Sequence, residues 1–424
     1  MKVLLVGGGG REHALACKLA QSPRLRSLMA APGNPGIAAY ADCVPVKDTA
    51  VDEMVALADR ERPDLVVVGP EAPLALGLAD RIRDRGVPVF GPGAAAARIE
   101  SSKAFAKDLM ARHGIPTARF QTFTDAAAAR EYCRQLGAPI VVKADGLAAG
   151  KGSMVCETLT AADRAISVCL EEAGFGEAGR RIVVEEFMEG EELSLFVLAS
   201  REEALPLGAA RDHKAVFDDD RGPNTGGMGA YSPVPLCDAA VEARIMREIV
   251  DPTLRAMAKE GCPYQGVLYV GLMVTRERIR VVEFNCRFGD PECQVLLPRL
   301  ETDLLPLLEV AAAGQALPPS LDWRPQASVC VVVASGGYPG AYQMGLPISG
   351  VSEADSRRGV AVFHAGTALR DGRLVTAGGR VLGVQALGGD LSTARARAYA
   401  AVESISFEGM HFRRDIARRA IGRR

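Results

Sequence analysis

Hydrophobic and polar positions in the first hundred residues follow two alternating patterns. Short continuous apolar runs, typical of buried parallel strands, are separated by stretches whose apolar residues recur at helical spacing. The runs at residues 2–6, 28–31, 65–68 and 87–90 predict strands, and the stretches at 12–21, 51–58 and 74–82 predict helices. This alternation predicts a doubly wound parallel sheet over residues 1–100.

The rest of the chain mixes helices with strands that follow one another directly. Helices are predicted at 100–112, 126–136, 239–259, 302–313 and 393–404, and strands at 139–143, 154–157, 181–185, 193–198, 266–274, 279–285, 329–334, 361–365, 374–376 and 380–387. Prolines 318, 319 and 325 suggest a boundary, and the basic C-terminal tail is predicted to be a solvated helix. We therefore expect an α/β (α+β overall) protein with domains at 1–100, 101–325 (lobes 117–190 and 191–325) and 326–424.

Composition narrows the class of protein. The chain has 424 residues and a net charge of −2, and about 150 residues per domain gives about three domains. Near-neutral charge without a Lys/Arg block argues against nucleic-acid or membrane surfaces, and no apolar run approaches the ~20 residues of a spanning helix. Ten scattered cysteines without a CxxC pair indicate reduced thiols in a cytoplasmic protein. We expect a monomer that binds small molecules.

The strand at 279–285 and its continuation to Glu292 carry the most distinctive chemistry. A period of two places Glu283, Asn285 and Arg287 on one face. Carboxylate and amide oxygens suit Mg²⁺, which completes its shell with water and substrate phosphates, and a guanidinium suits phosphate or carboxylate. The alternative is a solvated strand face with a surface ion pair. The following Gly-Asp-Pro makes that alternative less attractive.

Two glycine-rich loops could bind phosphate. Residues 7–10 precede a helix and offer backbone N–H groups to an anion. The GxGxxG fingerprint fails, because Glu12 or His13 stands where the third glycine belongs, so a mononucleotide-sized ligand is predicted rather than a dinucleotide. Residues 144–153, with Gly146, Gly150 and Gly152, could fold over a triphosphate but do not match a Walker A loop. The alternatives are a tight turn without a ligand and a plain hairpin.

Three further segments have a chemical and a structural interpretation. The acidic stretch 185–192 could be an adenine-binding hinge or a solvated turn, and the glycine-rich stretch 222–231 could close over substrate or be an idle loop. Lys103 and Lys107 lie one helical turn apart, which is most often a solvated face. His213 could be a general base, but a positional role is favoured since no partner is identifiable.

Taken in order, these motifs resemble those of the ATP-grasp superfamily. The segments 9–16, 69–74, 102–107, 143–152, 222–231 and 283–292 further resemble phosphoribosylamine–glycine ligases, over essentially the whole chain. The resemblance implies an ATP-grasp architecture with a small C-terminal α+β domain. It also implies ligation of glycine to 5-phosphoribosylamine, with ATP as co-substrate and Mg²⁺ or Mn²⁺ as cofactor, through a glycyl phosphate in the second step of purine synthesis.

The resemblance also implies roles for individual residues. It makes Arg287, Asp212 and Lys214 catalytic and assigns the metal to Glu283 and Asn285. ATP would be bound by Lys103, Lys143, Gly146, Gly150, Lys151, Gly152, Glu185, Glu186, Met188 and Glu192. The other substrates would be bound by Gly9, Gly10, Glu71, Asn224, Thr225, Gly226, Gly227 and Met228.

The chain departs from the family pattern at a few positions, and several rival functions are consistent with parts of the sequence. Gly8, Arg211 and Ala215 stand where relatives usually carry Asn, Gln and Arg, which puts one sugar-phosphate contact and the role of the 211–215 segment in doubt. Rivals are another ATP-grasp ligase or a biotin-type carboxylase, a nucleotide sensor without catalysis, and an NAD dehydrogenase. The 222–231 motif disfavours the first, the metal residues the second, and the failed fingerprint the third.

Overall fold

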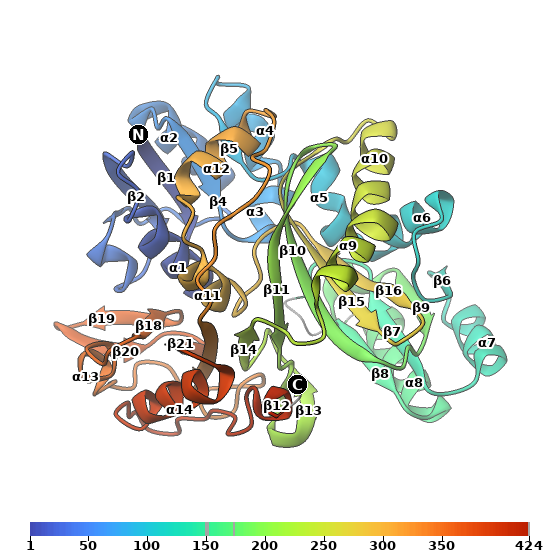
Figure 1. Ribbon diagram of the computed structural model, residues 1–424. Coiled ribbons are helices and arrows are strands. Elements are labelled where there is room, and N and C mark those ends of the chain that lie inside the picture. Colours follow the sequence, from blue (N-terminus) through green and yellow to red (C-terminus); the bar gives the residue numbers. More distant parts are fainter. Residues whose placement is uncertain (149–151, 173, 423–424) are drawn as a thin grey trace.

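The N-terminal part of the chain forms a parallel sheet covered by helices. The computed structural model describes residues 1–148, 152–172 and 174–422 (Figure 1). The sheet has the order β3-β2-β1-β4-β5 and every pairing in it is parallel, which confirms the predicted doubly wound unit. Its strands are β1 (Lys2–Gly7), β2 (Ser27–Pro32), β3 (Asp42–Cys43), β4 (Leu65–Val68) and β5 (Val89–Phe90), with helices α1 (Gly10–Leu19), α2 (Val51–Glu61), α3 (Glu71–Ala75) and α4 (Leu78–Arg83).

Two of the predicted helices are each divided by a backbone break. The stripe at 74–82 belongs to α3 and α4, because Gly77 between them has a left-handed φ of 81°. The predicted helix 100–112 belongs to α5 (Ala94–Ser101) and α6 (Lys103–His113), because Ser102 is extended. The Ser102 hydroxyl accepts a hydrogen bond from the Phe105 N–H at 3.1 Å, so it caps α6.

A small antiparallel sheet forms a separate lobe. Its order is β6-β9-β7-β8, and one face is covered by the predicted helix α7 (Ala126–Leu136) and by α8 (Leu159–Ile166). The strands are β6 (Phe120–Phe123), β7 (Ile140–Ala144), β8 (Ser153–Cys156) and β9 (Ile182–Glu186). Gly150 and Lys151, assigned to the loop between β7 and β8, lie outside the described residues.

The largest sheet is antiparallel, with the order β16-β15-β10-β11-β14-β17-β21-β18. Its strands are β10 (Glu191–Arg201), β11 (Glu203–Asp212), β14 (Gly229–Ser232), β15 (Tyr264–Val274), β16 (Ile279–Asn285), β17 (Ala327–Ala334), β18 (Val360–His364) and β21 (Arg380–Gly388). Since β14 pairs with β17, the sheet continues past residue 326. The domain division at that residue therefore stays a proposal.

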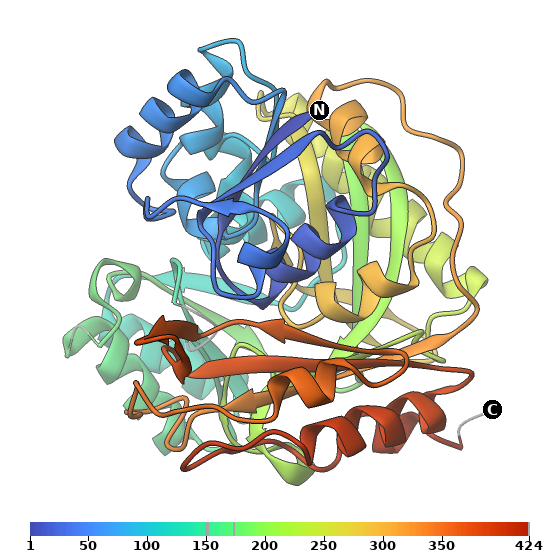
Figure 2. The same cartoon turned by 90° about the vertical axis from the view of Figure 1, so that its left-hand side faces the viewer.

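Helices and two hairpins complete the structure. The predicted helix 239–259 is helical throughout, as α9 (Ala239–Ile245), a π-helical turn at Met246–Val250 and α10 (Asp251–Lys259). The other elements are α11 (Cys293–Leu296), α12 (Leu304–Ala312), α13 (Val351–Asp355), α14 (Leu391–Val402), and the hairpins β12 (Ala215–Phe217) with β13 (Arg221–Asn224) and β19 (Thr367–Arg370) with β20 (Arg373–Thr376). Figure 2 shows the N-terminal unit above the C-terminal strands, with α14 along the bottom.

The predicted solvated helix in the basic tail is wrong. From the end of α14 to residue 422, the last one described, the only helical element is a short 3₁₀ turn at Arg418–Ala420, and Arg413 is 1% exposed. Arg413 forms ion pairs with Asp220 at 2.9 Å and Asp415 at 2.7 Å. The tail is therefore held against the β12–β13 hairpin by an ion pair between residues that are far apart in the sequence, Arg413 and Asp220.

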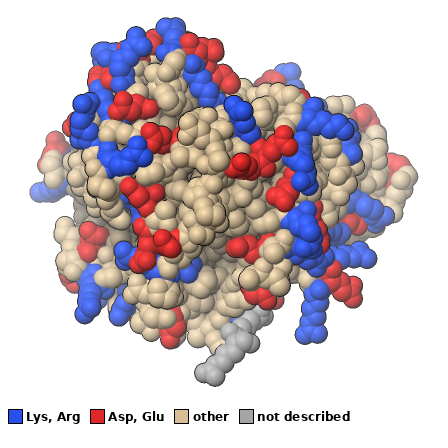
Figure 3. Space-filling model, turned by 45° about the horizontal axis from the view of Figure 1, so that its top comes forward, with Lys and Arg blue, Asp and Glu red and all other residues tan. Residues whose placement is uncertain are grey.

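The remaining features are the distribution of surface charge, the apolar character of the helices and the state of the cysteines. Acidic and basic side chains are interspersed over the face shown in Figure 3. Within the described residues, no helix has both the length and the apolar character needed to cross a membrane. All ten cysteines are free thiols.

Candidate active site

One cavity of about 540 Å³ brings together residues from all parts of the chain. Most of the site residues expected from the sequence line it: Glu71, Lys103, Lys143, Gly146, Gly152, Glu185, Glu186, Met188, Glu192, Asp212, Lys214, Asn224, Thr225, Gly226, Glu283, Asn285 and Arg287. Gly9, Gly10, Gly227 and Met228 are not among the lining residues. A cavity of this size suits a small-molecule ligand.

Strand β16 presents Glu283 and Asn285 to the cavity, as the period of two predicted. A register shift relative to β15 leaves Val282 out of the pairing, and its carbonyl accepts a hydrogen bond from Lys143 Nζ at 3.0 Å. Burial would raise the pKa of Glu283, but Lys214, Lys143 and Lys103 lower it, so the carboxylate is ionised.

The donor set on β16 fits a divalent cation that is shared with substrate phosphates. One carboxylate and one amide oxygen are the protein contribution that Mg²⁺ commonly receives, with the rest from water and phosphate. Among the described residues no group of three or more His, Cys, Asp or Glu side chains is arranged for a metal.

Arg287 is fixed by two carboxylates. Its guanidinium lies 3.2 Å from Glu71 and 3.1 Å from Glu100, and Glu100 also accepts a hydrogen bond from the Cys286 N–H at 2.7 Å. Burial alone would raise the pKa of Glu71, but Arg287 and Arg11 lower it to about 2. The pair of acids holds Arg287 at the wall of the cavity that Glu283 and Asn285 also line.

Lys143 belongs to a buried charge cluster that the sequence did not reveal. Glu185 lies between Lys143 at 2.9 Å and Lys107 at 2.8 Å, and each of the three side chains is at most 4% exposed. The interpretation of Lys107 as part of a solvated face is therefore wrong. Burial lowers the pKa of Lys107 to about 8, although Glu185 opposes this shift. Lys103 lies one turn earlier and donates to the Gly146 carbonyl at 3.0 Å.

The first two acids of the acidic hinge are paired with basic residues, whereas Glu189 is exposed. The carboxylate of Glu185 is occupied by the two lysines, and Glu186 pairs with Arg119 at 3.0 Å and Arg280 at 2.8 Å. Met188 is buried and lines the cavity. Groups that could read a base at this hinge are consequently the backbone and Met188, since the two carboxylates are already paired.

Lys214 lies two residues after the end of β11, among several carboxylates. Its Nζ lies 3.3 Å from Glu192 and 3.9 Å from Glu283. Burial would lower the pKa of Lys214, but Glu192, Tyr269 and Asp212 raise it well above its ordinary value. Burial raises the pKa of Asp212 to about 6 although Lys214 opposes this. The lysine is thus a fixed cation beside acids that are hard to ionise together.

His213 does not line the cavity. The residue is half-buried, its ring lies 6.0 Å from that of Tyr231, and its buried Nδ1 has no hydrogen-bond partner in the part of the chain that the structure describes. Burial, with Arg413 nearby, lowers its pKa to about 4. This placement supports neither a general base nor a direct contact with substrate.

The glycine-rich stretch 222–231 contains most of β13 and of β14, joined by a turn at residues 225–228. Thr225 Oγ1 donates to the Lys214 carbonyl at 2.8 Å and accepts from the Gly227 N–H at 2.9 Å. Met228 is fully buried against Val216 and Tyr338. Thr225 and Gly226 line the cavity, whereas Met228 anchors the turn from behind.

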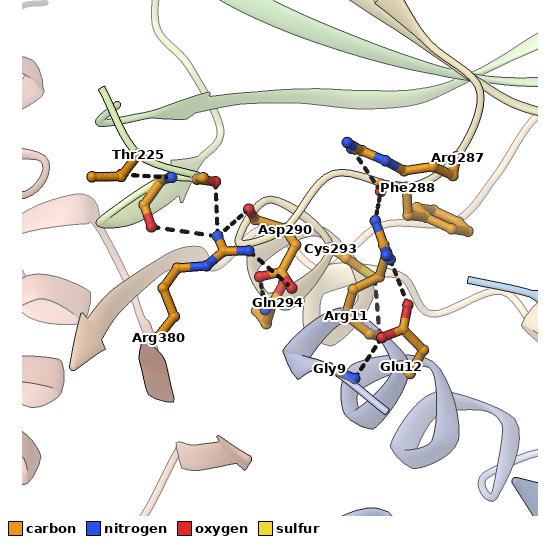
Figure 4. A network of polar contacts seen from close by, with 12 residues as sticks. Gly9, Arg11, Glu12, Thr225, Arg287, Phe288, Asp290, Cys293, Gln294 and Arg380 are labelled. Carbon is orange, nitrogen blue, oxygen red and sulfur yellow. Dashed lines mark hydrogen bonds and ion pairs between the residues drawn. The ribbon is translucent and has the colours of Figure 1, made fainter. Parts of the chain in front are cut away.

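The prediction of free N–H groups in the loop 7–10 is wrong for Gly9. Its N–H donates to the Glu12 carboxylate at 2.7 Å (Figure 4), and Asp290 accepts a hydrogen bond from the Arg11 backbone. Protein carboxylates therefore already occupy the positive end of α1. The role of Gly9 and Gly10 in substrate binding stays a prediction.

Several lining residues were not found from the sequence. They are Arg11, Glu100, Lys107, Asp290, Glu292, Tyr338, Tyr342 and Arg380. Glu292 is 4% exposed, and burial together with Asp212 raises its pKa to about 8. No sequence signal marks Tyr338, Tyr342 and Arg380, because they reach the cavity from the part of the chain that begins with β17, called the C-terminal unit below. Asp290 and Glu292 could have been found, since they lie in the 283–292 motif that begins on β16.

Comparisons with known proteins agree over the whole chain. Residues 1–100, 101–293 and 328–419 match the N domain, the ATP-grasp (A) domain and the C domain of phosphoribosylglycinamide synthetase. A phosphoribosylamine–glycine ligase from Rhizobium meliloti (strain 1021) is 53% identical over 423 residues, covering 100% of this chain and 99% of the relative. One from Pseudomonas aeruginosa is 49% identical over 425 residues with the same coverage.

Solved structures give the same result. The crystal structure of phosphoribosylamine–glycine ligase from Thermotoga maritima has a TM-score of 0.84 and 32% identity, and covers 98% of this chain and 100% of that chain. The biotin carboxylase domain of 2-oxoglutarate carboxylase from Hydrogenobacter thermophilus has a TM-score of 0.74 at 18% identity, covering 97% and 91%, which shows a shared fold alone. The chain therefore belongs to the phosphoribosylglycinamide synthetase family, whose catalytic domain is an ATP-grasp domain.

Proposed function

We propose that this protein ligates glycine to 5-phosphoribosylamine at the expense of ATP, giving glycinamide ribonucleotide, ADP and phosphate in the second step of purine synthesis. The observation that carries this proposal is the convergence of Lys103, Lys143 and Lys214 on the Glu283–Asn285 face of β16, within one cavity. A cluster of fixed cations around two metal-type donors suits phosphoryl transfer, which depends mainly on positioning and charge neutralisation.

The reaction would have two chemical steps. A glycine carboxylate oxygen attacks the γ-phosphorus of ATP, the bond to the β,γ-bridging oxygen breaks, and glycyl phosphate and ADP form. The amine of phosphoribosylamine then attacks the glycyl carbonyl, phosphate leaves, and the amine loses a proton. No protein nucleophile is required.

We assign the nucleotide end of the cavity to the small lobe. Lys103 and Lys143 would contact ATP phosphates, with Gly146, Gly150, Lys151 and Gly152 forming the flap over them. The hinge backbone at 186–188 and Met188 would receive adenine, and Glu192 would take the ribose. Glu185 would act by holding Lys143 in place, because its carboxylate is bound by two lysines.

We assign the acceptor end to residues beside β16. Arg287, held by Glu71 and Glu100, would bind the γ-phosphate or the glycine carboxylate. Asp212 and Lys214 would stabilise reacting groups, while Glu71, Gly9, Gly10 and the turn 224–228 would contain phosphoribosylamine. The Gly8, Arg211 and Ala215 departures fall outside this set; Arg211 instead pairs with Glu191 at 3.0 Å.

Enzymes of the ATP-grasp family use ATP with a divalent metal ion. Glu283 and Asn285 would hold it here, as Mg²⁺ or Mn²⁺. When bound, the ion would neutralise charge on the nucleotide phosphates.

A requirement for all three substrates tests the proposed reaction. Purified protein with ATP and Mg²⁺ should release phosphate only when glycine and freshly made phosphoribosylamine are both present, and the product should contain one glycyl group per ribose phosphate. Omitting each substrate in turn is the control. Phosphate release with bicarbonate or formate, and none with glycine, would instead favour another ATP-grasp ligase or a carboxylase.

We also propose that the protein is a monomer that acts in the cytoplasm. Ten free thiols suit a reducing compartment. Sedimentation equilibrium at several concentrations would test the monomer, with a mass of 44.8 kDa expected throughout.

A further inference from the structure

Arg380 brings the C-terminal unit to the acceptor end of the cavity. It is the first residue of β21, lines the cavity, and its side chain is 21% exposed. In Figure 4 its guanidinium lies between the turn that contains Thr225 and the carboxylate of Asp290.

The guanidinium bonds to both neighbours. Its Nη1 donates to the Gly226 carbonyl at 2.7 Å and to the Asp290 carbonyl at 2.6 Å, and its Nη2 lies 3.5 Å from the Asp290 carboxylate. Tyr338, also from the C-terminal unit, accepts a hydrogen bond from the Gly226 N–H at 3.2 Å. The C-terminal unit thus holds both polar groups of Gly226.

Gly226 leaves room for this contact. A Cβ there would lie 2.9 Å from the guanidinium carbon of Arg380, so a larger residue would displace the guanidinium. At Gly227, a Cβ would lie 2.5 Å from Pro291, so the turn is packed tightly on the 290–291 segment. The two glycines let the turn lie flat against Arg380 and Pro291.

Asp290 connects this contact to the N-terminal unit. Its carboxylate accepts hydrogen bonds from Gln294 Nε2 at 2.8 Å and from the Arg11 backbone at the start of α1. Burial would raise the pKa of Asp290, but Arg380 and Arg11 lower it, so the carboxylate is ionised and keeps these partners. Arg380 therefore lies at a junction of three parts of the chain.

We propose that Arg380 is a positioning residue for the acceptor substrates: it fixes the turn 225–227 against Asp290 and so sets the cavity wall that glycine and the amine meet. A fork of donors is needed, because two carbonyls and a carboxylate are engaged at once, and lysine cannot reproduce that geometry. The nucleotide end depends on other contacts, those of Lys103, Lys107 and Lys143 with Gly146 and Glu185. The identity of the substrates rests on the proposed function, whereas the fixing of the turn does not.

Amide hydrogen exchange without substrates tests the fixing of the turn directly. In Arg380→Ala, peptides that cover residues 224–229 should exchange faster than in the wild type, because Gly226 loses a partner on its carbonyl. Arg373→Ala is the matched control, since it removes the same charge from an exposed site on β20 of the same unit. Equal exchange in Arg380→Ala and wild type would overturn the proposal.

Steady-state kinetics test the consequence for substrates. For Arg380→Ala, kcat/KM for glycine and the amine should fall about tenfold or more while KM for ATP changes little, and Arg380→Lys should recover only part of the loss. A parallel rise of KM for ATP, or full recovery with lysine, would contradict the proposal.

If Arg380→Ala does not fold, Tyr338→Phe serves instead, because it removes the acceptor for the Gly226 N–H. Its kcat/KM for glycine and the amine should fall by a smaller factor while KM for ATP changes little, and wild-type kinetics of this variant would overturn the proposal. If Arg380→Ala exchanges faster but the wild-type protein does not use glycine, the proposed function is rejected, while the fixing of the turn by Arg380 still holds.

Discussion

At Glu283, burial and neighbouring charge act in opposite directions on one carboxyl group. Burial favours the neutral acid, whereas Lys214, Lys143 and Lys103 favour the carboxylate, and the lysines prevail. Without its charge the site would lose the proposed anionic donor to the metal, yet the fold would lose little, because the Glu283 side chain is 30% exposed and the Lys214 Nζ lies 3.9 Å away. Function and stability should therefore separate at this residue.

Glu283→Gln should lower kcat at saturating Mg²⁺ by about a hundredfold or more, since a charge-stabilising group of the transition state is lost. The melting temperature should stay close to that of the wild type. Glu277→Gln, in the exposed turn between β15 and β16, is the matched control and should leave both quantities unchanged. Unchanged turnover of Glu283→Gln would argue against a metal role for this strand.

At the scale of elements, three of them meet through a single carboxylate. Helix α6 supplies Lys107, β7 supplies Lys143 and β9 supplies Glu185, and Lys107 also donates to Thr117 Oγ1 at 2.8 Å. A buried carboxylate with two cations is stable only while both partners remain, because desolvation penalises any unpaired charge. This cluster positions Lys143 through its buried contact with Glu185.

Lys107→Met should lower the free energy of unfolding by about 3 kcal/mol, because Glu185 would keep only one of its two buried partners. KM for ATP should also rise, since Lys143 would be drawn toward Glu185. Chemical denaturation and ATP titration measure the two effects. Lys259→Met, at an exposed position in the last turn of α10, is the control; an equal loss in both variants would show that the buried cluster is not the cause.

At the scale of the whole molecule, His13 joins the first helix to the C-terminal unit. Its Nδ1 accepts a hydrogen bond from the His364 N–H at 2.8 Å, and its ring packs edge-on against Phe363 at 5.5 Å. Burial, with a smaller contribution from His364, lowers the pKa of His13 to about 3. Protonation would remove the acceptor lone pair as well as place a charge in this contact.

The pH dependence of stability should reveal this contact. Unfolded chains bind a proton at His13 below about pH 6.5 while the folded state does not until about pH 3, so stability is lost as pH falls through that window. Between pH 7 and pH 5 the loss from this residue should be about 2 kcal/mol. His13→Asn keeps an acceptor near the Nδ1 position but cannot titrate, so its unfolding free energy should depend less on pH. An identical dependence in both proteins would contradict the assignment.

Local patterns predicted much of the fold because the elements concerned obey local rules. Continuous apolar runs predicted β1, β2 and β4 in a parallel sheet, and the stripe of α7 was predicted with its full extent. The breaks at Gly77 and Ser102 were harder, because a left-handed residue or a single cap interrupts an apolar stripe without changing its spacing. The prediction of a solvated helix in the tail was wrong because of long-range contacts: the charges of the tail are neutralised by Asp218–Asp220, almost 200 residues away.

The sequence by itself determined the family and many of the residues that line the cavity, Glu283 and Asn285 among them, because these lie in contiguous motifs whose side-chain period is set by the backbone. Only the tertiary structure decided how those residues are held. The partners of Arg287, Glu185 and Asp290 come from distant segments, and burial and charge at such junctions depend on what folding brings together. For the same reason no motif marks Arg380 as a positioning residue, because its contact with the turn at Gly226 exists only where folding places β21 beside that turn.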